Sequence, residues 1–209
     1  SLFNLQLPGF IYSRLTNPTV SALEERIAAL EDGRGATATA SGHAAQILAL
    51  FPLMHTGDEI IAANKLYGGS INQMGISYKK FGWNASFVDP DDPENFQRAI
   101  TDKTKAIFIE SLANPGGVVV DIEAVAAIAH DAGIPLIVDN TMATPYLCKP
   151  FEHGADIIVH STTKFLSGNG SSIGGCVVDS GKFNFAGRDK SPSLSQPAPE
   201  YHGLTFSET

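Results

Sequence analysis

The sequence has 209 residues, of which 43% are hydrophobic and 17% are charged, a composition typical of one globular domain or two small ones. Its formal net charge of −8 argues against a nucleic-acid partner, because the neutralisation of phosphates requires a basic surface. No apolar run approaches the length of a membrane span, and Cys148 and Cys176 form no CxxC pair, so we expect a reducing cytoplasm without a disulfide framework or a zinc site.

The first predicted unit is an N-terminal arm, residues 1–19, which is rich in aromatic residues and prolines and has no clear period. Because such a segment has few local partners, we expect it to pack on a neighbouring subunit or domain. Asn17 or Thr16 can cap a helix whose first turn takes Pro18. The apolar residues that then repeat at helical spacing before Gly33 are Val20, Leu23, Ile27 and Leu30.

The stretch ATATASGHAAQILALFPLM (residues 36–54) begins with small residues, which indicate a flexible segment, and continues with strong helix formers. Ser41 and Gly42 therefore open a helix, where free N–H groups and the helix dipole favour an anion. An ordinary serine cap is the alternative interpretation of a Ser-Gly pair. His43 has no second metal ligand at a suitable spacing, so the sequence predicts no metal site here.

From residue 58 onward, short apolar runs alternate with helical patterns. The predicted strands are residues 59–62, 85–88, 106–110, 134–138, 157–159 and 175–178. The predicted helices are residues 71–78, 92–100 and 121–131. This alternation predicts a three-layer α/β/α domain whose mostly parallel sheet is covered on both faces. In such sheets, ligands bind beyond the carboxyl ends of the strands.

Polar residues gather where that rule predicts a site. Glu110, Asn114, Asp139 and the cluster at residues 161–164 all lie at or just past strand ends. Asp139 and Lys164 follow successive strands, so we expect them to face one crevice. The alternatives are a turn-forming aspartate, since Asp-Asn-Thr suits a turn, and a solvated lysine after an edge strand.

The predicted set of groups suits one cofactor. A lysine amine can form an imine, a carboxylate can pair with a pyridinium nitrogen, and a helix start rich in N–H groups can hold a phosphate. Together these groups describe a site for pyridoxal phosphate. The sequence contains neither a GxGxxG after a strand nor a P-loop, so it does not support a nicotinamide or nucleotide site.

These residues stand in motifs that resemble the Cys/Met-metabolism family of pyridoxal-phosphate enzymes. The resemblance covers nearly the whole chain and implies the large cofactor-binding domain of the fold-type I, aspartate-aminotransferase-like enzymes. The segments that carry it are YSRLTNPT (12–19), ASGHAA (40–45), LYGGS (66–70), ESLANPGG (110–117), IVDNTMATPYLCKPFEHGADIIVHSTTKFLSGNGSSIGG (137–175) and PEYHG (199–203).

The resemblance implies roles around the cofactor ring. Lys164 matches the lysine that binds the cofactor as an imine, and Asp139 matches the acid that keeps the pyridine nitrogen protonated. Tyr67 matches the tyrosine that stacks on the ring and assists proton transfer. Asn114 would contact the 3-hydroxyl oxygen of the ring.

The resemblance also implies how the phosphate is held. The residues that would surround it are Ser41, Gly42, His43, Ser161 and Thr163. Tyr12 and Arg14 match a pair that reaches the phosphate of a neighbouring subunit's cofactor, which explains the predicted arm. The family usually forms a tetramer of two active dimers, so we expect a homotetramer.

The implied activity is that of the family branch that acts on O-acetylhomoserine. It is a γ-replacement in methionine biosynthesis, in which sulfide or a thiol displaces acetate and homocysteine forms. The alternatives are the cystathionine γ-synthase and γ-lyase reactions of the same family, and a catalytically silent cofactor-binding fragment. Gly69 disfavours a methionine γ-lyase, which typically carries a cysteine at this position.

The chain departs from the family pattern in two places. Leu112 stands where the family commonly has proline, which we expect to alter only the turn. The arginine that grips the substrate's α-carboxylate lies in a C-terminal domain, and no residue here matches it. We therefore expect a piece of a longer protein, with a cofactor-binding domain at residues 20–190 and a loop at residues 191–209 leading to the further domain.

Overall fold

The strands form a single sheet in the computed structural model of the chain, which describes residues 9–186 and 190–208. Their order across the sheet is β1-β7-β6-β5-β4-β2-β3. Strand β7 is antiparallel to both of its neighbours and the other pairs are parallel, so the prediction of a mostly parallel sheet is confirmed. The strands are β1 (Gly35–Thr39), β2 (Glu59–Ala63), β3 (Asn84–Val88), β4 (Thr104–Glu110), β5 (Leu136–Asp139), β6 (Ile157–His160) and β7 (Gly175–Asp179).

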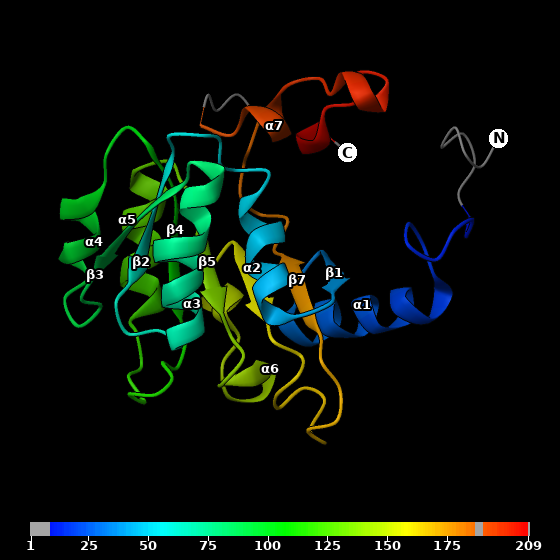
Figure 1. Ribbon diagram of the computed structural model, residues 1–209, viewed down its shortest axis with the longest axis horizontal. Coiled ribbons are helices and arrows are strands. Elements are labelled where there is room, and N and C mark those ends of the chain that lie inside the picture. Colours follow the sequence, from blue (N-terminus) through cyan, green and yellow to red (C-terminus); the bar gives the residue numbers. More distant parts are fainter. Residues whose placement is uncertain (1–8, 187–189, 209) are drawn as a thin grey trace.

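Helices cover both faces of this sheet. Figure 1 shows α2 and α3 in front of the strands and α5 behind them, so the predicted α/β/α layering is confirmed. The longer helices are α1 (Pro18–Glu31), α2 (Gly42–Leu50), α3 (Gly68–Asn72), α4 (Glu94–Ala99) and α5 (Ile122–Asp131). A π turn, η2 (Gln73–Ser77), and a 3₁₀ turn, η3 (Tyr78–Phe81), extend α3, whereas α6 (Thr144–Leu147) and η4 (Pro150–His153) are single turns between β5 and β6.

The middle strands β4, β5 and β6 are buried on both faces. Their apolar residues are almost fully inaccessible, as expected for parallel strands with helices on either side. Strand β7 adds Cys176 and Val178 to the same core. This buried centre fixes the carboxyl ends of three neighbouring strands at one edge of the sheet, which is where the polar residues of the predicted site follow.

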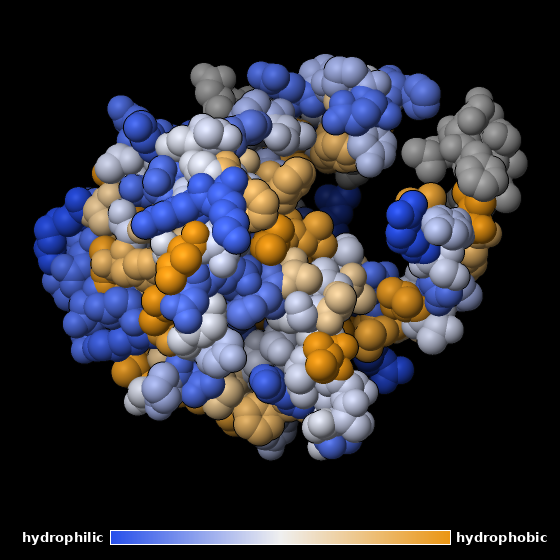
Figure 2. All heavy atoms as spheres, viewed as in Figure 1, coloured by the Kyte–Doolittle hydropathy of each residue, from blue (hydrophilic) through white to orange (hydrophobic). Residues whose placement is uncertain are grey.

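Helix α1 begins as the sequence predicts but buries little of its apolar stripe. The Asn17 side chain caps it, accepting hydrogen bonds from the N–H groups of Thr19 and Val20. Val20, Leu23 and Leu30 are 39%, 49% and 46% exposed, and only Ile27 of the stripe is buried. Figure 2 shows apolar side chains on the outer surface over this helix. A surface of this kind is typical of a contact with another chain or domain.

Strand β1 corrects the prediction of a flexible segment before Ser41. Residues 35–39 pair with β7 at the edge of the sheet. Their alternation of alanine and threonine lacks the large apolar residues that identify a buried strand, although threonine favours strands. The end of β1 lies close to the start of β7: a Cβ on Gly175 would lie 2.1 Å from the carbonyl oxygen of Ser41 and 2.5 Å from Thr39 Oγ1, so β7 must begin with glycine.

The two ends of the chain lie outside the sheet. Of the predicted arm, residues 1–8 are outside the described residues, and residues 9–16 contain only a turn before α1. The predicted loop after residue 190 contains only short turns: α7 (Pro192–Ser195), η5 (Pro199–Tyr201) and η6 (Phe206–Glu208). None of the helices in residues 9–186 and 190–208 is long and apolar enough to span a membrane.

Candidate active site

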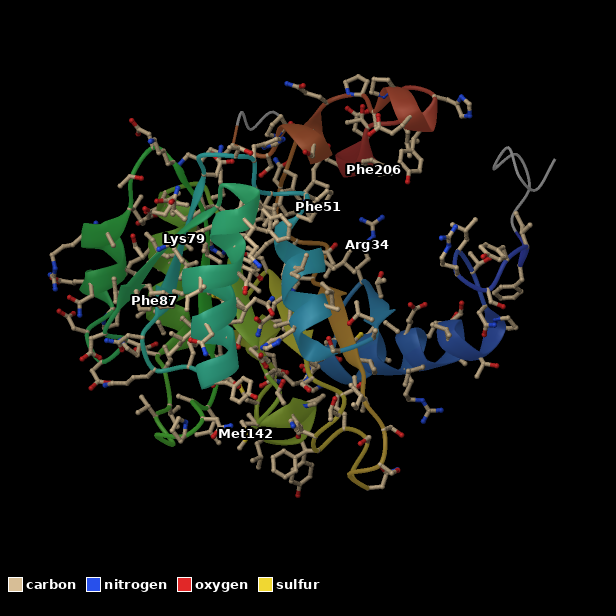
Figure 3. The ribbon with its side chains drawn as sticks, viewed as in Figure 1. Arg34, Phe51, Lys79, Phe87, Met142 and Phe206 are labelled. Carbon is tan, nitrogen blue, oxygen red and sulfur yellow. The ribbon has the colours of Figure 1, made fainter. Side chains whose placement is uncertain are left out.

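A cavity of about 720 Å³ opens at the carboxyl ends of the central strands. In Figure 3 its edge is marked by Met142, which follows β5 and lies beside α6. The predicted site residues that line the cavity are Ser41, Gly42, His43, Tyr67, Asn114, Asp139, Ser161, Thr163 and Lys164. The fold therefore brings together residues from the ends of three strands and the starts of two helices.

Lys164 lies in the loop that follows β6. Its backbone N–H donates to the carbonyl of Ser161, and its own carbonyl accepts from Gly168. The hydroxyl of Thr163 ties this loop to β7, because it accepts from the N–H of Gly174 and donates to the Gly174 carbonyl. Within the described residues, Lys164 Nζ has no hydrogen bond or ion pair and lines the cavity, so the amine is available to a ligand.

Asp139, at the end of β5, is oriented by its neighbour Thr141. Asp139 Oδ1 accepts from the Thr141 N–H at 3.0 Å and from Thr141 Oγ1 at 2.5 Å. Thr141 Oγ1 in turn accepts from the N–H of Ser161 at 2.8 Å, which links the ends of β5 and β6. Since both contacts use Oδ1, the other carboxylate oxygen of Asp139 is left for the cavity. The sequence analysis missed Thr141, although a threonine two residues after a strand-end aspartate is the pattern of such a turn.

Glu110, at the end of β4, holds two loops of the cavity through its carboxylate. Oε1 accepts from the N–H of Tyr67 at 2.7 Å and Oε2 accepts from the N–H of Asn114 at 2.9 Å. Burial raises the pKa of Glu110 to about 7, and the nearby charge of Asp139 adds to the rise, while the two N–H donors oppose it. The sequence analysis named Glu110 as a strand-end acid but assigned it no role; the contacts identify it as the anchor of both loops.

The raised pKa of Glu110 predicts a pH-dependent free energy of unfolding. Between its ordinary pKa of 4.5 and about 7, the folded protein holds a proton that the unfolded chain has lost. The stability that the protonated Glu110 contributes to the folded protein is therefore complete below pH 4.5, declines as the pH rises and is gone above about pH 7. Glu110 is only 4% exposed, so the expected decline is roughly 3 kcal/mol.

Denaturant unfolding of the cofactor-free protein between about pH 5 and about pH 8 tests this decline. The unfolding free energy of Glu110→Gln minus that of the wild type should increase as the pH rises to about 7, because only the wild type loses stability in this range. Above about pH 7 this difference should stay constant. Glu123→Gln is the control, because Glu123 is exposed on the first turn of α5, and it should follow the wild type at every pH. A constant difference between Glu110→Gln and the wild type across this range would contradict the assignment.

The start of α2 forms a cradle for an anion. Ser41 Oγ caps the helix by accepting from the N–H of Ala44, whereas the N–H groups of Gly42 and His43 have no acceptor within the described residues. A Cβ on Gly42 would lie 2.7 Å from the Cβ of Ser161, so only glycine lets the helix start approach the end of β6 this closely. Both interpretations of Ser41 thus hold together: it is a cap, and it leaves two N–H donors facing the cavity.

Tyr67 stands at the start of α3 and lines the same cavity as Lys164. Its ring lies 6.1 Å from that of His43, with an interplanar angle of 36°. A Cβ on Gly69 would lie 2.4 Å from the Tyr67 ring and 3.0 Å from the His43 ring, so a larger residue would displace both rings. The two rings therefore form an aromatic wall that a planar ligand can contact.

These groups fit pyridoxal phosphate. Lys164 supplies an unpartnered amine, Asp139 an oriented carboxylate with one free oxygen, and α2 two unpartnered N–H donors. The chain offers no comparable site for a metal, because no group of three His, Cys, Asp or Glu residues in the described ranges could hold one. Thr163 fits less directly than predicted, since its hydroxyl hydrogen already serves Gly174.

Tyr12 and Arg14 are the two predicted site residues that do not line the cavity. They lie before α1, away from the strand ends (Figure 1), with the Arg14 guanidinium 5.3 Å from the centre of the Tyr12 ring. Cavity residues that the sequence analysis did not name include Gln46, Ser70 and Thr141.

Comparison with known proteins identifies relatives along the whole chain. The family profile described as "Cys/Met metabolism PLP-dependent enzyme" matches residues 1–194. A homocysteine/cysteine synthase of Saccharomyces cerevisiae is 51% identical over 209 residues, which are 99% of this chain and 47% of that protein. An O-acetyl-L-homoserine sulfhydrylase of Leptospira meyeri is also 51% identical, over 207 residues, with the same two coverages of 99% and 47%.

Solved structures share the fold as well. A putative O-acetylhomoserine (thiol)-lyase from Campylobacter jejuni, which contains a pyridoxyl-lysine monophosphate group, matches with a TM-score of 0.95 and 42% identity. The match covers 99% of this chain and 52% of that one. Cystathionine γ-lyase from Lactobacillus plantarum matches with a TM-score of 0.79 and 41% identity over 84% of this chain and 46% of its own. The chain thus spans about half the length of the relatives it matches.

Proposed function

Because the chain belongs to the Cys/Met metabolism PLP-dependent enzymes, we propose that it is the cofactor-binding part of an O-acetylhomoserine sulfhydrylase. The reaction is a γ-replacement in methionine biosynthesis, in which O-acetylhomoserine and sulfide, or a thiol, give homocysteine and acetate. The observation that carries the proposal is the cavity in which Lys164, Asp139 and the start of α2 converge. The names of relatives such as the Leptospira sulfhydrylase support the choice of substrate.

Pyridoxal phosphate is the cofactor of this family, and when bound it supplies a carbonyl for the amine of the substrate and a ring that accepts electrons. Lys164 Nζ would hold its carbonyl, the free oxygen of Asp139 its ring nitrogen, and Asn114 its ring hydroxyl. The N–H groups of Gly42 and His43, beside Ser41, would hold its phosphate. Ser161 adds a hydroxyl with no other partner in the described ranges, and Thr163 contributes mainly by fixing the loop at Gly174.

The proton transfers fall to Lys164 and Tyr67. With the substrate's amine in the place of Lys164 Nζ, this nitrogen would be the group that removes a proton first from the α carbon of the substrate and then from its β carbon. Tyr67 lies across the same cavity and is the second group that can carry a proton. Acetate then leaves the γ carbon with the electrons of its C–O bond, and hydrosulfide adds there. The return of one proton to the β carbon and one to the α carbon completes the replacement.

The proposal extends to the organisation of the whole protein. The arm at residues 1–19, with Tyr12 and Arg14, reaches a neighbouring subunit, and the exposed stripe of Val20, Leu23 and Leu30 supports a contact there. Residues 20–190 form the cofactor-binding domain, and residues 191–209 lead toward a further domain with the arginine that grips the substrate's carboxylate. We propose a cytoplasmic homotetramer of two active dimers.

An alternative is another reaction of the same family. The structural match to the cystathionine γ-lyase of Lactobacillus plantarum, at 41% identity, keeps a γ-lyase in consideration, and cystathionine γ-synthase differs only in using cysteine in place of sulfide. A cofactor-binding piece without catalysis is the third possibility. The sulfhydrylase makes homocysteine from O-acetylhomoserine and sulfide, and a cystathionine γ-synthase makes cystathionine from O-acetylhomoserine and cysteine. A γ-lyase splits cystathionine, and a silent piece forms no product with any of these compounds, so assays with them separate the alternatives.

The decisive experiment supplies the purified protein with pyridoxal phosphate and O-acetylhomoserine, then adds sulfide in one reaction and cysteine in another. We expect homocysteine and acetate with sulfide, at a rate at least about tenfold above the formation of cystathionine with cysteine. A faster reaction with cysteine would instead identify a cystathionine γ-synthase. Cofactor absorbance without any product would identify the silent cofactor-binding piece.

A further inference from the structure

A buried polar cluster lies behind the cavity, between helix α1 and the ends of three strands. Its members are Glu31, Ser111, Asn140 and His160, and none of them lines the cavity. Glu31, Asn140 and His160 are 0% exposed, and Ser111 is 4% exposed. A cluster of this polarity is costly to bury, so its contacts call for an explanation beyond packing.

Glu31 is the centre of the cluster. From the last turn of α1, its Oε1 contacts His160 Nε2 at 2.5 Å and accepts from Asn140 Nδ2 at 2.9 Å. Asn140 Oδ1 accepts from Ser111 Oγ at 2.7 Å, so the chain of hydrogen bonds runs from β6 through α1 to β5 and β4. The second carboxylate oxygen of Glu31 and His160 Nδ1 have no partner within the described residues, so Glu31 Oε1 carries the contacts to both His160 and Asn140, and His160 depends on Glu31 for its one side-chain contact.

Each strand-end member of the cluster is the direct neighbour of a cavity residue. Ser111 follows Glu110, Asn140 follows Asp139, and His160 precedes Ser161. In a strand, successive side chains point to opposite faces, so a residue held on one face sets the position of the next residue on the other. The cluster therefore controls how the ends of β4, β5 and β6 are aligned with one another.

We propose that Glu31 is a positioning residue of the cofactor site, which holds Asn140 and His160 together and thereby sets Asp139 against the loop of Lys164. The proposal rests on the proposed function, because it assumes that these two residues bind the cofactor. Glu31 touches neither the cavity nor a ligand in it. It acts on the cofactor only through the ends of β5 and β6, where Asn140 and His160 lie.

The test measures cofactor binding in the protein with Glu31→Gln, a substitution that keeps the volume but replaces the carboxylate with a neutral amide, whose oxygen is a weaker acceptor for Asn140 and a weaker partner for His160. We expect the dissociation constant for pyridoxal phosphate to rise about tenfold to about a hundredfold, as with other residues that orient ligand-binding groups. The visible circular dichroism of the bound cofactor should weaken as well, because its ring is less firmly oriented. Both readouts are independent of turnover.

Glu24→Gln is the matched control. Glu24 lies on the same helix, and its Oε1 accepts from a backbone N–H, that of Ala38 in β1, at 2.8 Å. Glutamine replaces this carboxylate acceptor with a weaker, neutral one, so the substitution should lower the unfolding temperature but change the cofactor's dissociation constant by less than about twofold. A Glu31→Gln protein that loses thermal stability yet keeps the wild-type dissociation constant and dichroism would overturn the proposal.

Ser111→Ala keeps the proposal testable if Glu31→Gln does not fold. It removes the hydroxyl that donates to Asn140 Oδ1 at 2.7 Å and, more weakly, to the Asp139 carbonyl at 3.4 Å, and we expect about a threefold rise in the dissociation constant. An unchanged constant in a folded Ser111→Ala protein would then overturn the proposal. If the wild-type protein itself binds no pyridoxal phosphate, the proposed function fails, and that result is distinct from a failure of the positioning role.

Discussion

Lys164→Ala should abolish covalent cofactor binding and lower turnover by on the order of 10⁴-fold or more. The amine of Lys164 has two proposed tasks, to bind the cofactor's carbonyl and to move protons on the substrate, and either loss alone is severe. No other lysine lines the cavity, so no neighbouring amine of the described chain can take over. The measurement is visible absorbance after exhaustive dialysis, followed by the sulfide assay.

Two further variants test whether Lys164 is needed for its reactive amine or only for its positive charge. Lys164→Arg keeps a cation at the same place, but a guanidinium stays protonated and forms no imine, so it should be as inactive as Lys164→Ala. Lys182→Ala is the control, since Lys182 is exposed on the loop after β7, and it should keep wild-type absorbance and turnover. If Lys164→Arg retained more than about a tenth of the turnover, the role of Lys164 as cofactor anchor and base would be wrong.

The central part of the fold was predictable because its strands are continuous apolar runs. Strands β4 and β5 end in the polar residues Glu110 and Asp139, Ser161 directly follows β6, and the rule for parallel sheets places such ends at one edge. Short-range signals also located the helix starts, with Asn17 capping α1 and Ser41 capping α2. Where the signal is local and periodic, prediction from the sequence works.

Strand β1 and the cluster around Glu31 were not predictable in the same way. Glu31 is the last residue of an amphipathic helix, where a carboxylate normally faces solvent, and its partner His160 is 129 positions away in the sequence. The alanines and threonines of β1 indicate a strand only once β7 and Gly175 are known to lie beside them. Both features depend on tertiary contacts that have no periodic trace in the sequence.

Asp139→Asn should lower kcat by about 10²- to 10³-fold while leaving the protein folded and able to bind pyridoxal phosphate. The reason lies in how Thr141 uses the side chain. Thr141 donates to Oδ1 through both its N–H and its hydroxyl, and an asparagine can present its own Oδ1 to the same donors. The substitution therefore preserves the turn and changes only the group that remains for the cavity.

The side-chain atom of residue 139 that Thr141 does not bind determines how the substitution affects kcat. In the wild type it is a carboxylate oxygen, which in the proposed site accepts a hydrogen bond from the ring nitrogen and stabilises its protonated form. In Asp139→Asn it is the amide Nδ2, a donor, which can pair only with an unprotonated nitrogen. Affinity is then partly kept, but the ring no longer carries the positive charge that stabilises electrons withdrawn from the substrate, a loss of about 3 to 4 kcal/mol in the transition state.

Steady-state kinetics and cofactor titration of Asp139→Asn test this separation, with Asp121→Asn as the matched control. Asp121 also accepts a backbone N–H, that of Ala124, but it caps α5 outside the cavity, and asparagine caps a helix about as well. The control should keep wild-type kcat. If Asp139→Asn kept kcat within about threefold of the wild type, the reaction would not need a protonated ring nitrogen, and the carboxylate would have no electrostatic role. A fall in cofactor affinity as large as the fall in kcat would instead mean that the carboxylate serves to bind the ring and does not activate it, because a purely activating interaction lowers kcat alone.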